Sequence, residues 1–229
     1  IQNDGNGITI KKHEKEKIYI PQLIFGELLT SSNYKKDEKR IVGGKNGYGA
    51  KLANIFSQTF TIETVDHINS LKYTQTWEKN MTVCNKPVIK KCSAKPYTKI
   101  TWKCDFNRFG LQKYSDDMIN LMYRRIYDIA GITDKSVSVY LNGNKIKIKS
   151  FLDYINLYND FKKYQQVVSD RWDVIFSVSH NDTFEQLSFV NGICTSKGGS
   201  HVECIAKQVC NGIIAFIKKK HKKEIKDKV

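Results

Sequence analysis

The sequence lacks the cysteine and histidine patterns that bind structural metals. None of its six cysteines forms a C-x-x-C pair, and no Cys/His cluster has zinc-finger spacing. We interpret the cysteines as reduced thiols of an intracellular protein and expect no metal site. No apolar run is long enough to span a membrane and no signal peptide is present, so we expect no membrane partner.

The sequence also lacks an initiating methionine, since Ile1 leads directly into a polar, glycine-containing stretch. We therefore expect a piece of a longer protein. The 229 residues are 40% hydrophobic and 11% aromatic, which suffices for a core in one large domain or two small ones. Internal repeats and low-complexity linkers are absent from the sequence.

Acidic residues are too few to balance the basic ones. The chain has 38 Lys and Arg residues against 23 Asp and Glu residues, a net charge of +15. This excess favours an anionic partner, of which nucleic acid is the usual one. The abundance of Lys, Asn, Ile and Tyr is also typical of an AT-rich genome, so charge alone leaves the function open.

Glycine is concentrated in the stretch 43–57, GGKNGYGAKLANIFS. Glycines allow a backbone to approach a ligand closely, and a following helix offers free N–H groups to an anion. The P-loop pattern fails because Lys51 comes one place late and Leu52 replaces the hydroxyl residue. The dinucleotide fingerprint also fails at Leu52. The loop alone leaves a phosphate cradle and an ordinary surface loop as alternatives.

Hydrophobic periodicity predicts a mixed α/β chain with a seam near 150–168. Residues 3–10 read as a turn entering a strand, and a hairpin with an Asn142-Gly143 turn is expected over 137–151. Two further strands are expected within 171–192, joined at Asn181-Asp182. Alternation predicts strands, and helical spacing or capping predicts helices. The strands are expected over 59–66, 71–77 and 98–106, and the helices over 21–29, 50–57, 116–130 and 202–217.

Four segments in a fixed order carry a resemblance to a known family. They are NDGNGI (3–8), LIFGELLTSSNY (23–34), GGKNGYGAKLANIFS (43–57) and SFVNGICTSKGGSHV (188–202). Together they resemble the ATPase region of eukaryotic type IIA DNA topoisomerases, from Ile1 to about Lys220. The D-x-G-x-G turn is a weak sign of the family, because many loops contain it. The second and third segments at this spacing are highly specific, and the fourth is an independent match.

The resemblance implies an α/β (α+β) fold with two domains. Residues 1–150 would form a GHKL (Bergerat-type) ATPase sandwich without its N-terminal part. Residues 151–229 would form a smaller α/β transducer domain without its C-terminal part. The implied function is the ATP-binding and hydrolysing N-gate of an ATP-dependent topoisomerase, which couples ATP to DNA strand passage.

The resemblance also assigns residues around the nucleoside. Asp4 would accept a hydrogen bond from the adenine amino group, since a carboxylate only accepts and that amine only donates. Asp4 departs from many eukaryotic relatives, which carry Asn there. Thr98 would be a second adenine-side contact, and Ser31, Ser32 and Asn33 would contact ribose and phosphate. The structural alternatives are a turn at Asp4, a helix-ending turn at 30–33 and an ordinary strand threonine.

The glycine-rich loop would be the ATP lid. The residues implied are Gly44, Lys45, Asn46, Gly47, Tyr48, Gly49, Ala50 and Lys51. Backbone N–H groups at Gly47 and Gly49 would converge on β- and γ-phosphate oxygens, assisted by a helix that begins near Gly49. Asn46 and Tyr48 would donate further hydrogen bonds, and Lys51 would add charge. Relatives often carry Arg at the position of Lys45. Lysine keeps the positive charge there but loses the bidentate geometry of arginine.

Three consecutive lysines, Lys218, Lys219 and Lys220, match a basic triplet that contacts DNA in relatives. Lysines neutralise phosphates without reading sequence. The structural alternative is a solvated helix end, where lysines complement the helix dipole.

No catalytic residue is expected in this chain. The family's general-base Glu and magnesium-binding Asn would lie upstream of Ile1, and its Gln-Thr-Lys loop downstream of Val229. The cofactors implied are ATP and Mg²⁺, and the partner is double-stranded DNA. We expect a nuclear protein that is a homodimer at full length, with this piece monomeric. The rival functions are another GHKL ATPase, of mismatch-repair or chaperone type, and a basic nucleic-acid-binding module without nucleotide chemistry.

Overall fold

The structure, a computed structural model, describes residues 1–28, 30, 43–44 and 46–221. These residues form two compact units, which divide between Ser115 and Asp116; residue 43 groups with the second unit and residue 44 with the first. This division lies before the predicted domain boundary at 150, because the helix that begins at Asp116 packs with elements of the second unit. The functional assignment of 1–150 and 151–229 stays a prediction. No helix among the described residues is long and apolar enough to cross a membrane.

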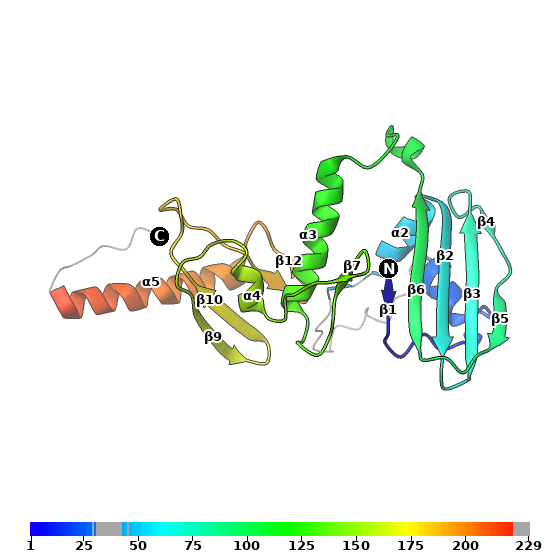
Figure 1. Ribbon diagram of the computed structural model, residues 1–229, viewed down its shortest axis with the longest axis horizontal. Coiled ribbons are helices and arrows are strands. Elements are labelled where there is room, and N and C mark those ends of the chain that lie inside the picture. The colour runs from blue at the N-terminus through cyan, green and yellow to red at the C-terminus, as the bar shows by residue number, and fades with distance from the viewer. Residues whose placement is uncertain (29, 31–42, 45, 222–229) are drawn as a thin grey trace. The chain divides into compact units, whose positions relative to one another are not determined.

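The first unit is built on a six-stranded antiparallel sheet (Figure 1). Its order is β1-β6-β2-β3-β4, and β5 also pairs with β3. Strands β2 and β3 confirm the predicted alternation, since their inner positions are buried. Strand β6 forms as predicted, but its inner positions are only partly covered and Trp102 is exposed. The strands are β1 (Gln2–Asn3), β2 (Ser57–Asp66), β3 (Leu71–Glu78), β4 (Val83–Cys84), β5 (Val88–Lys91) and β6 (Tyr97–Cys104).

Two short helices, α1 (Ile20–Gly26) and α2 (Gly49–Ile55), cover one face of this sheet (Figure 1). Both were expected from sequence, α1 because Pro21 suits a helix opening. The core between the layers consists of Ile10, Phe25, Phe60, Ile62, Tyr73 and Trp77. Stacking of helix on sheet therefore leaves the opposite face of the sheet as an outer face.

The N-terminal segment differs from its prediction. The strand comes before the glycine turn, as β1, and residues 7–10 form no strand. Side chains of β2 replace a sheet ladder there: the Ile8 N–H donates to Thr64 Oγ1 at 3.0 Å, and the Ile10 N–H donates to Asp66 Oδ2 at 2.8 Å. Strand β6 also ends earlier than expected, at Cys104, where a short 3₁₀ helix η2 (Phe106–Phe109) follows.

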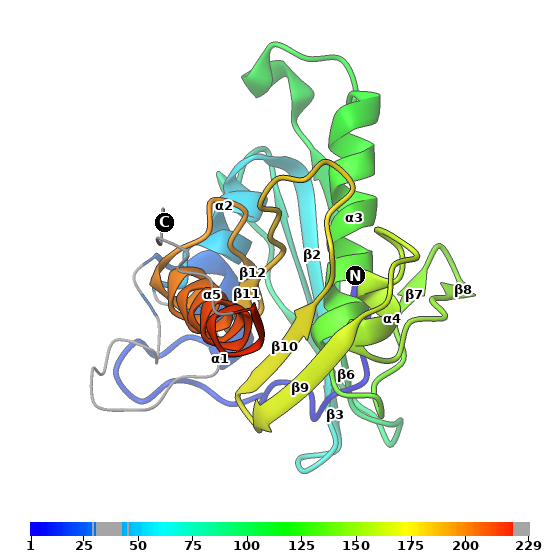
Figure 2. The ribbon, with the colours of Figure 1, turned by 90° about the vertical axis from the view of Figure 1, so that its left-hand side faces the viewer.

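The second unit contains three helices and three two-stranded hairpins among its described residues (Figure 2). Asn142 and Gly143 have φ of 50° and 83°, the left-handed turn that was predicted for them. The helices are α3 (Asp116–Ile132), α4 (Phe151–Ile155) and α5 (Ser200–His221). The hairpins pair β7 (Tyr140–Leu141) with β8 (Asn144–Lys145), β9 (Tyr164–Ser169) with β10 (Trp172–Phe176), and β11 (Phe189–Val190) with β12 (Ile193–Cys194).

The predicted pairing of two strands across Asn181-Asp182 is wrong. Strand β10 pairs with the preceding strand β9, which was not predicted from the sequence. Strand β11 pairs with the following strand β12. The turn of the last hairpin is Asn191-Gly192, with φ of 50° and 81°. The hairpin turn therefore forms at Asn191-Gly192 and not at Asn181-Asp182, because Asn-Gly is the stronger turn signal.

Candidate functional site

The first set of predicted residues lies at the junction of β1 with β6. Asn3 is directly opposite Thr98 in this ladder, and Asp4 follows Asn3 immediately. Asp4 is exposed and Thr98 is half-buried. The register therefore places Asn3, and not the predicted Asp4, directly opposite Thr98. In the D-x-G-x-G spacing over residues 3–7, Asn3 also stands at the first position, so the adenine contact of Asp4 stays a prediction.

Thr64 holds this junction together, and the sequence reading missed it. Its hydroxyl donates to the Tyr97 carbonyl oxygen at 2.9 Å and accepts from the Ile8 N–H at 3.0 Å. The hydroxyl oxygens of Thr64 and Thr98 are 3.1 Å apart, so Thr98 acts as the donor once the Thr64 proton is committed. Thr64 is fully buried. A polar residue in phase with Phe60 and Ile62 was the available signal.

Gly7, the second glycine of the turn over residues 3–7, passes against the backbone of β2. Its φ is 73°, and a Cβ there would lie 2.0 Å from the Val65 carbonyl oxygen. Only glycine fits both the left-handed conformation and this approach. Gly5 carries no such demand, because its φ is not in that region and an added Cβ would meet only Asn3 Oδ1 at 3.2 Å.

Asp66 anchors the chain that leaves this turn. Burial alone would raise the pKa of Asp66, but the Asn69 side chain and the backbone N–H groups of Ile10, Asn69 and Ile68 outweigh it and hold the pKa below the usual range. The bond from the Ile10 N–H is buried. An ionised Asp66 therefore stabilises residues 8–10, and with them the position of the turn.

The second set of predicted residues forms the loop before α2. Gly47 has φ of 69°, a conformation that favours glycine. Gly49 opens α2, and a Cβ at Gly49 would meet nothing within 4 Å. The left-handed backbone conformation therefore explains Gly47, whereas neither conformation nor packing requires a glycine at position 49. The space at Gly49 fits a backbone that must accept a close ligand such as a phosphate.

Lys51 closes this loop onto its helix. Its ammonium donates to the Gly47 carbonyl oxygen at 2.9 Å, and the residue is 1% exposed. Burial lowers the pKa of Lys51, while the charge of Glu27 opposes the shift. In this structure Lys51 stabilises the loop conformation. Its contact with phosphate stays a prediction, as do those of Asn46, Tyr48 and Ala50.

Four of the predicted residues, Ser31, Ser32, Asn33 and Lys45, lie outside the described residues. The magnesium-binding Asn implied by the resemblance was expected upstream of Ile1, with no metal ligand in this chain. Across residues 1–28, 30, 43–44 and 46–221, no three His, Cys, Asp or Glu side chains group to hold a metal ion.

The predicted DNA-binding lysines lie in the last turns of α5. Lys218, Lys219 and Lys220 are exposed, and the Lys220 ammonium lies 5.6 Å from the centre of the Phe216 ring. Exposed lysines at a helix C-terminus agree with phosphate contact and with a solvated helix end alike.

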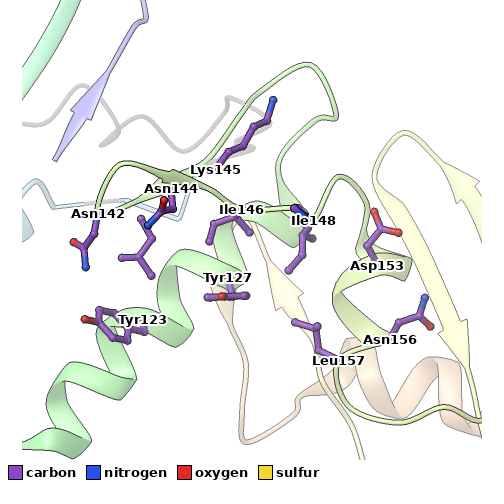
Figure 3. A pocket seen from close by; sticks show the side chains of 12 residues that line it. Tyr123, Tyr127, Asn142, Asn144, Lys145, Ile146, Ile148, Asp153, Asn156 and Leu157 are labelled. Atoms are coloured by element: carbon purple, nitrogen blue, oxygen red, sulfur yellow. The ribbon is translucent and has the colours of Figure 1, made fainter.

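A separate hollow lies in the second unit, bounded by α3, the β7–β8 hairpin and α4 (Figure 3). Its volume is about 690 Å³, and none of the predicted site residues lines it. Tyr123 and Tyr127 from α3 point toward the hairpin, while Asp153 and Asn156 lie at the α4 side (Figure 3). Asp153 is already bonded to the Lys149 N–H at 3.0 Å, which fixes the start of α4.

The chain is similar in sequence to known proteins over nearly its whole length. Residues 135–229 match the family described as DNA gyrase B. The chain is 49% identical to DNA topoisomerase 2 of Candida glabrata over 99% of its length, and 45% identical to DNA topoisomerase 2-alpha of Homo sapiens over 97%. These alignments cover 17% and 15% of the two relatives, so the chain spans about a sixth of their length.

Solved structures give the same result for the fold. The ATPase region of Saccharomyces cerevisiae topoisomerase II superposes with a TM-score of 0.88 and 47% identity, covering 95% of this chain and 58% of that one. The ATPase and transducer domains of DNA topoisomerase II from Balamuthia mandrillaris give 0.90 and 42%, covering 96% and 57%. The mixed α/β fold predicted from the motifs is thus confirmed, and the chain is a homologue of the ATPase region of eukaryotic DNA topoisomerase II.

Proposed function

We propose that this chain is the ATP-binding N-gate region of an ATP-dependent type IIA DNA topoisomerase. The observation that carries the proposal is the 45–49% identity over 97–99% of the chain to DNA topoisomerase 2 proteins. The two sets of site residues support it. One set surrounds the β1–β6 junction, and the other forms the glycine loop and the start of α2. Residues 1–150 would then be the ATPase domain and 151–229 the transducer.

In the proposed site, the chain binds and orients ATP. Asp4 accepts a hydrogen bond from the adenine amino group, and Thr98 makes a second contact on the adenine side. Ser31, Ser32 and Asn33 contact ribose and phosphate. Residues 44–51 (Gly44, Lys45, Asn46, Gly47, Tyr48, Gly49, Ala50 and Lys51) surround the phosphates, where N–H groups at a helix start favour negative charge. Closing this lid excludes water from the phosphates.

Magnesium would be held chiefly by the nucleotide phosphates, as is usual for Mg²⁺ sites that bind phosphorylated ligands. We assign no general base within the chain, because a base must reach the attacking water and the resemblance implies a Glu upstream of Ile1 for that role. The base and the DNA-cleaving residues would come from other parts of a longer protein. The relatives are about six times as long as this chain.

DNA would contact this region at Lys218, Lys219 and Lys220. In the complete protein, a nuclear homodimer, ATP binding would close the two N-terminal regions on each other while one duplex passes through another. Hydrolysis would then reset the gate through the transducer. The ligand thus selects one of two conformational states by its γ-phosphate.

The test is calorimetric binding of a non-hydrolysable ATP analogue with Mg²⁺ to this chain and to a version extended at both ends. We expect the extended chain to bind, and Lys51→Ala to weaken binding while the matched surface change Lys95→Ala leaves it unaltered. A folded extended chain that binds no analogue would contradict the proposal. A basic DNA-binding module without nucleotide chemistry would then be the better account.

A further inference from the structure

The outer face of the first unit's sheet carries an ordered array of threonines. In register, Thr61 lies between Thr76 of β3 and Thr101 of β6, and the Thr61 and Thr76 hydroxyl oxygens are 2.9 Å apart. Thr59 and Thr74 lie on the same face, because they alternate with buried positions of β2 and β3. The centre of this face is therefore rich in hydroxyl groups.

Lysines surround the threonine array. Lys99 and Lys103 lie on the outer side of β6, where Lys99 is opposite Glu63 and Lys103 is opposite Thr59. Lys90 of β5 is directly opposite Lys72 of β3, and these two with Thr74 and Val88 line a hollow of about 310 Å³. Lys72 is compensated by an ion pair with Glu63, whereas Lys90 has no carboxylate oxygen within 4.0 Å among the described residues.

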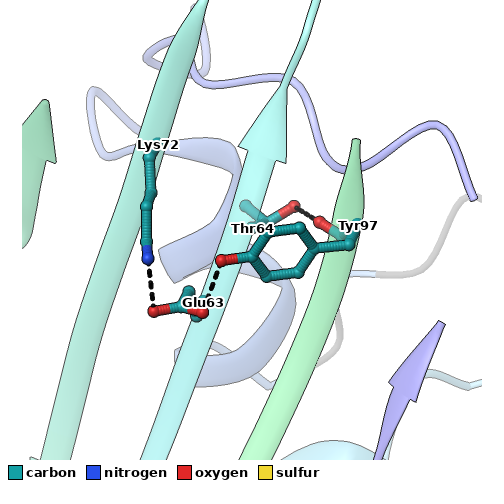
Figure 4. A network of polar contacts seen from close by, with 4 residues as sticks. All are labelled: Glu63, Thr64, Lys72 and Tyr97. Carbon is teal, nitrogen blue, oxygen red and sulfur yellow. Dashed lines mark hydrogen bonds and ion pairs between the residues drawn. The ribbon is translucent and has the colours of Figure 1, made fainter. Parts of the chain in front are cut away.

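Two carboxylates share this face, and both have partners. Glu63 forms an ion pair with Lys72 at 2.8 Å and accepts from the Tyr97 hydroxyl (Figure 4). Glu78 accepts from the Asn85 side-chain amide at 3.1 Å. Among the described residues, Lys90, Lys99 and Lys103 have no carboxylate oxygen within 4.0 Å. The face thus has a net positive charge with three available ammonium groups.

We propose that this outer face binds the phosphate backbone of duplex DNA without reading its sequence. Lys and Thr side chains are common partners of phosphate oxygens, and neither is arranged here to enter a groove and read base edges. From β5 to β6 the face spans three strand spacings, about 14 Å, and from Lys99 to Lys103 about 13 Å along the strand. These lengths are close to the roughly 12 Å width of the major groove, so lysines at the margins reach phosphates on both sides of a groove.

This surface goes beyond the proposed contact at Lys218, Lys219 and Lys220. It belongs to the first unit, it needs no bound nucleotide, and its lysines come from three strands of one sheet. Binding there would hold duplex DNA against the ATPase fold itself. Its failure is distinguishable from a failure of the proposed function, because ATP-analogue binding does not depend on any residue of this face.

The test measures fluorescence anisotropy of a labelled 20-bp duplex across a salt series. All proteins carry Lys218→Gln, Lys219→Gln and Lys220→Gln, so that the helix lysines do not contribute. The test variant adds Lys90→Gln, Lys99→Gln and Lys103→Gln. The matched control instead adds three changes in loops of the same unit, Lys11→Gln, Lys15→Gln and Lys113→Gln, with the same loss of charge.

Each lysine that contacts a phosphate contributes about 0.9 to the slope of log K against log salt, so we expect the slope of the test variant to fall by about two to three. Its affinity at about 0.1 M salt should fall at least tenfold more than that of the control. Thr101→Val, which keeps all charges, should weaken binding about twofold to fivefold with the slope unchanged. Where the triple change impairs folding, Lys99→Gln and Lys103→Gln are measured singly and each should lower the slope by about one.

Three results would overturn the proposal. The first is unchanged affinity and slope in a folded test variant. The second is an equal loss in the control, which would assign the effect to net charge. The third is tighter binding of single-stranded than of duplex DNA with the same sensitivity to these changes.

Discussion

The hydroxyl oxygens of Thr64 and Thr98 lie 3.1 Å apart and join β2 to β6 directly beside the start of the D-x-G-x-G turn. Thr64 also accepts the Ile8 N–H and donates to the Tyr97 carbonyl. One buried hydroxyl therefore sets the relative position of the turn and of Thr98.

Replacement of this hydroxyl tests that role. Thr64→Val keeps the shape of the side chain but leaves the Ile8 N–H and the Tyr97 carbonyl without their buried partner. We expect the free energy of unfolding to fall by about 2 kcal/mol, measured by urea denaturation. Thr101→Val, on the outer face, should change it by less than about 0.5 kcal/mol. Equal effects of the two changes would show that Thr64 has no special structural role.

Gly47 and Gly49, at the start of α2, should respond differently to replacement by alanine. Gly47→Ala places a side chain at φ of 69° and should cost about 1 kcal/mol of stability. Gly49→Ala has open space at a helix start, so stability should hold or rise by up to about 1 kcal/mol. Thermal unfolding measures both.

Gly49→Ala also separates folding from binding. If backbone groups at Gly49 contact phosphate, an added methyl should weaken ATP-analogue binding about tenfold or more in the extended chain, since a hydrogen bond to a charged group is worth about 1.5–3 kcal/mol. The comparison is a calorimetric titration of wild type and Gly49→Ala side by side. Unchanged analogue affinity would place the phosphates elsewhere.

The Glu63 network makes stability depend on pH. Hydrogen bonds from Lys72 and then Tyr97 hold the pKa of Glu63 below its usual value, against the effect of burial. A lowered pKa contributes stability above the unfolded pKa of about 4.3 and loses it as pH falls through the folded value. Glu63→Gln should therefore cost about 1 kcal/mol at pH 7, a value that allows for partial exposure, and less near pH 3, which lies below the unfolded pKa.

Urea midpoints of wild type and Glu63→Gln at the two pH values measure this difference. A gap that persists undiminished at pH 3 would assign the effect to lost packing and not to the charge.

Glycine 131 tests the packing of α3 on α4. Alanine normally improves a helix interior by up to about 1 kcal/mol over glycine. At Gly131, however, an added Cβ would lie 2.6 Å from the Tyr154 Cβ. We expect Gly131→Ala to destabilise by about 1–2 kcal/mol in thermal unfolding. The matched change Gly212→Ala in α5, where nothing lies within 4 Å, should stabilise; stabilisation by both would show that α3 and α4 are not closely packed.

Local sequence signals predicted the elements that depend on local chemistry. Alternation identified β2, β3 and β6, and helical spacing identified α3 and α5, because the apolar pattern of each element repeats within it. That pattern is buried in β2 and β3 and only partly covered in β6, α3 and α5. The Asn142-Gly143 turn followed from backbone chemistry for the same reason. The motif resemblance supplied the candidate site residues, which periodicity alone could not have done.

Partner choice over long sequence distances could not be predicted. No local pattern shows that β1 pairs with β6, or that β10 pairs with β9 and not with the strand that follows it. Thr64 was missed because its role depends on three partners distant in sequence. A polar residue in a buried phase of a strand indicates some such role but does not identify the partners.

The β1–β6 pairing has a consequence for the order in which the molecule assembles. Gln2 meets Lys99 across a loop of nearly the whole first unit, whereas β2 and β3 are joined by a short turn. Loop closure over such a distance costs entropy that nearby contacts must first offset, so the hairpin forms early and the edge strand docks late. The edge that carries Asp4 is thus among the last parts of the unit to become ordered and, by the same reasoning, among the first to exchange its amide hydrogens with solvent.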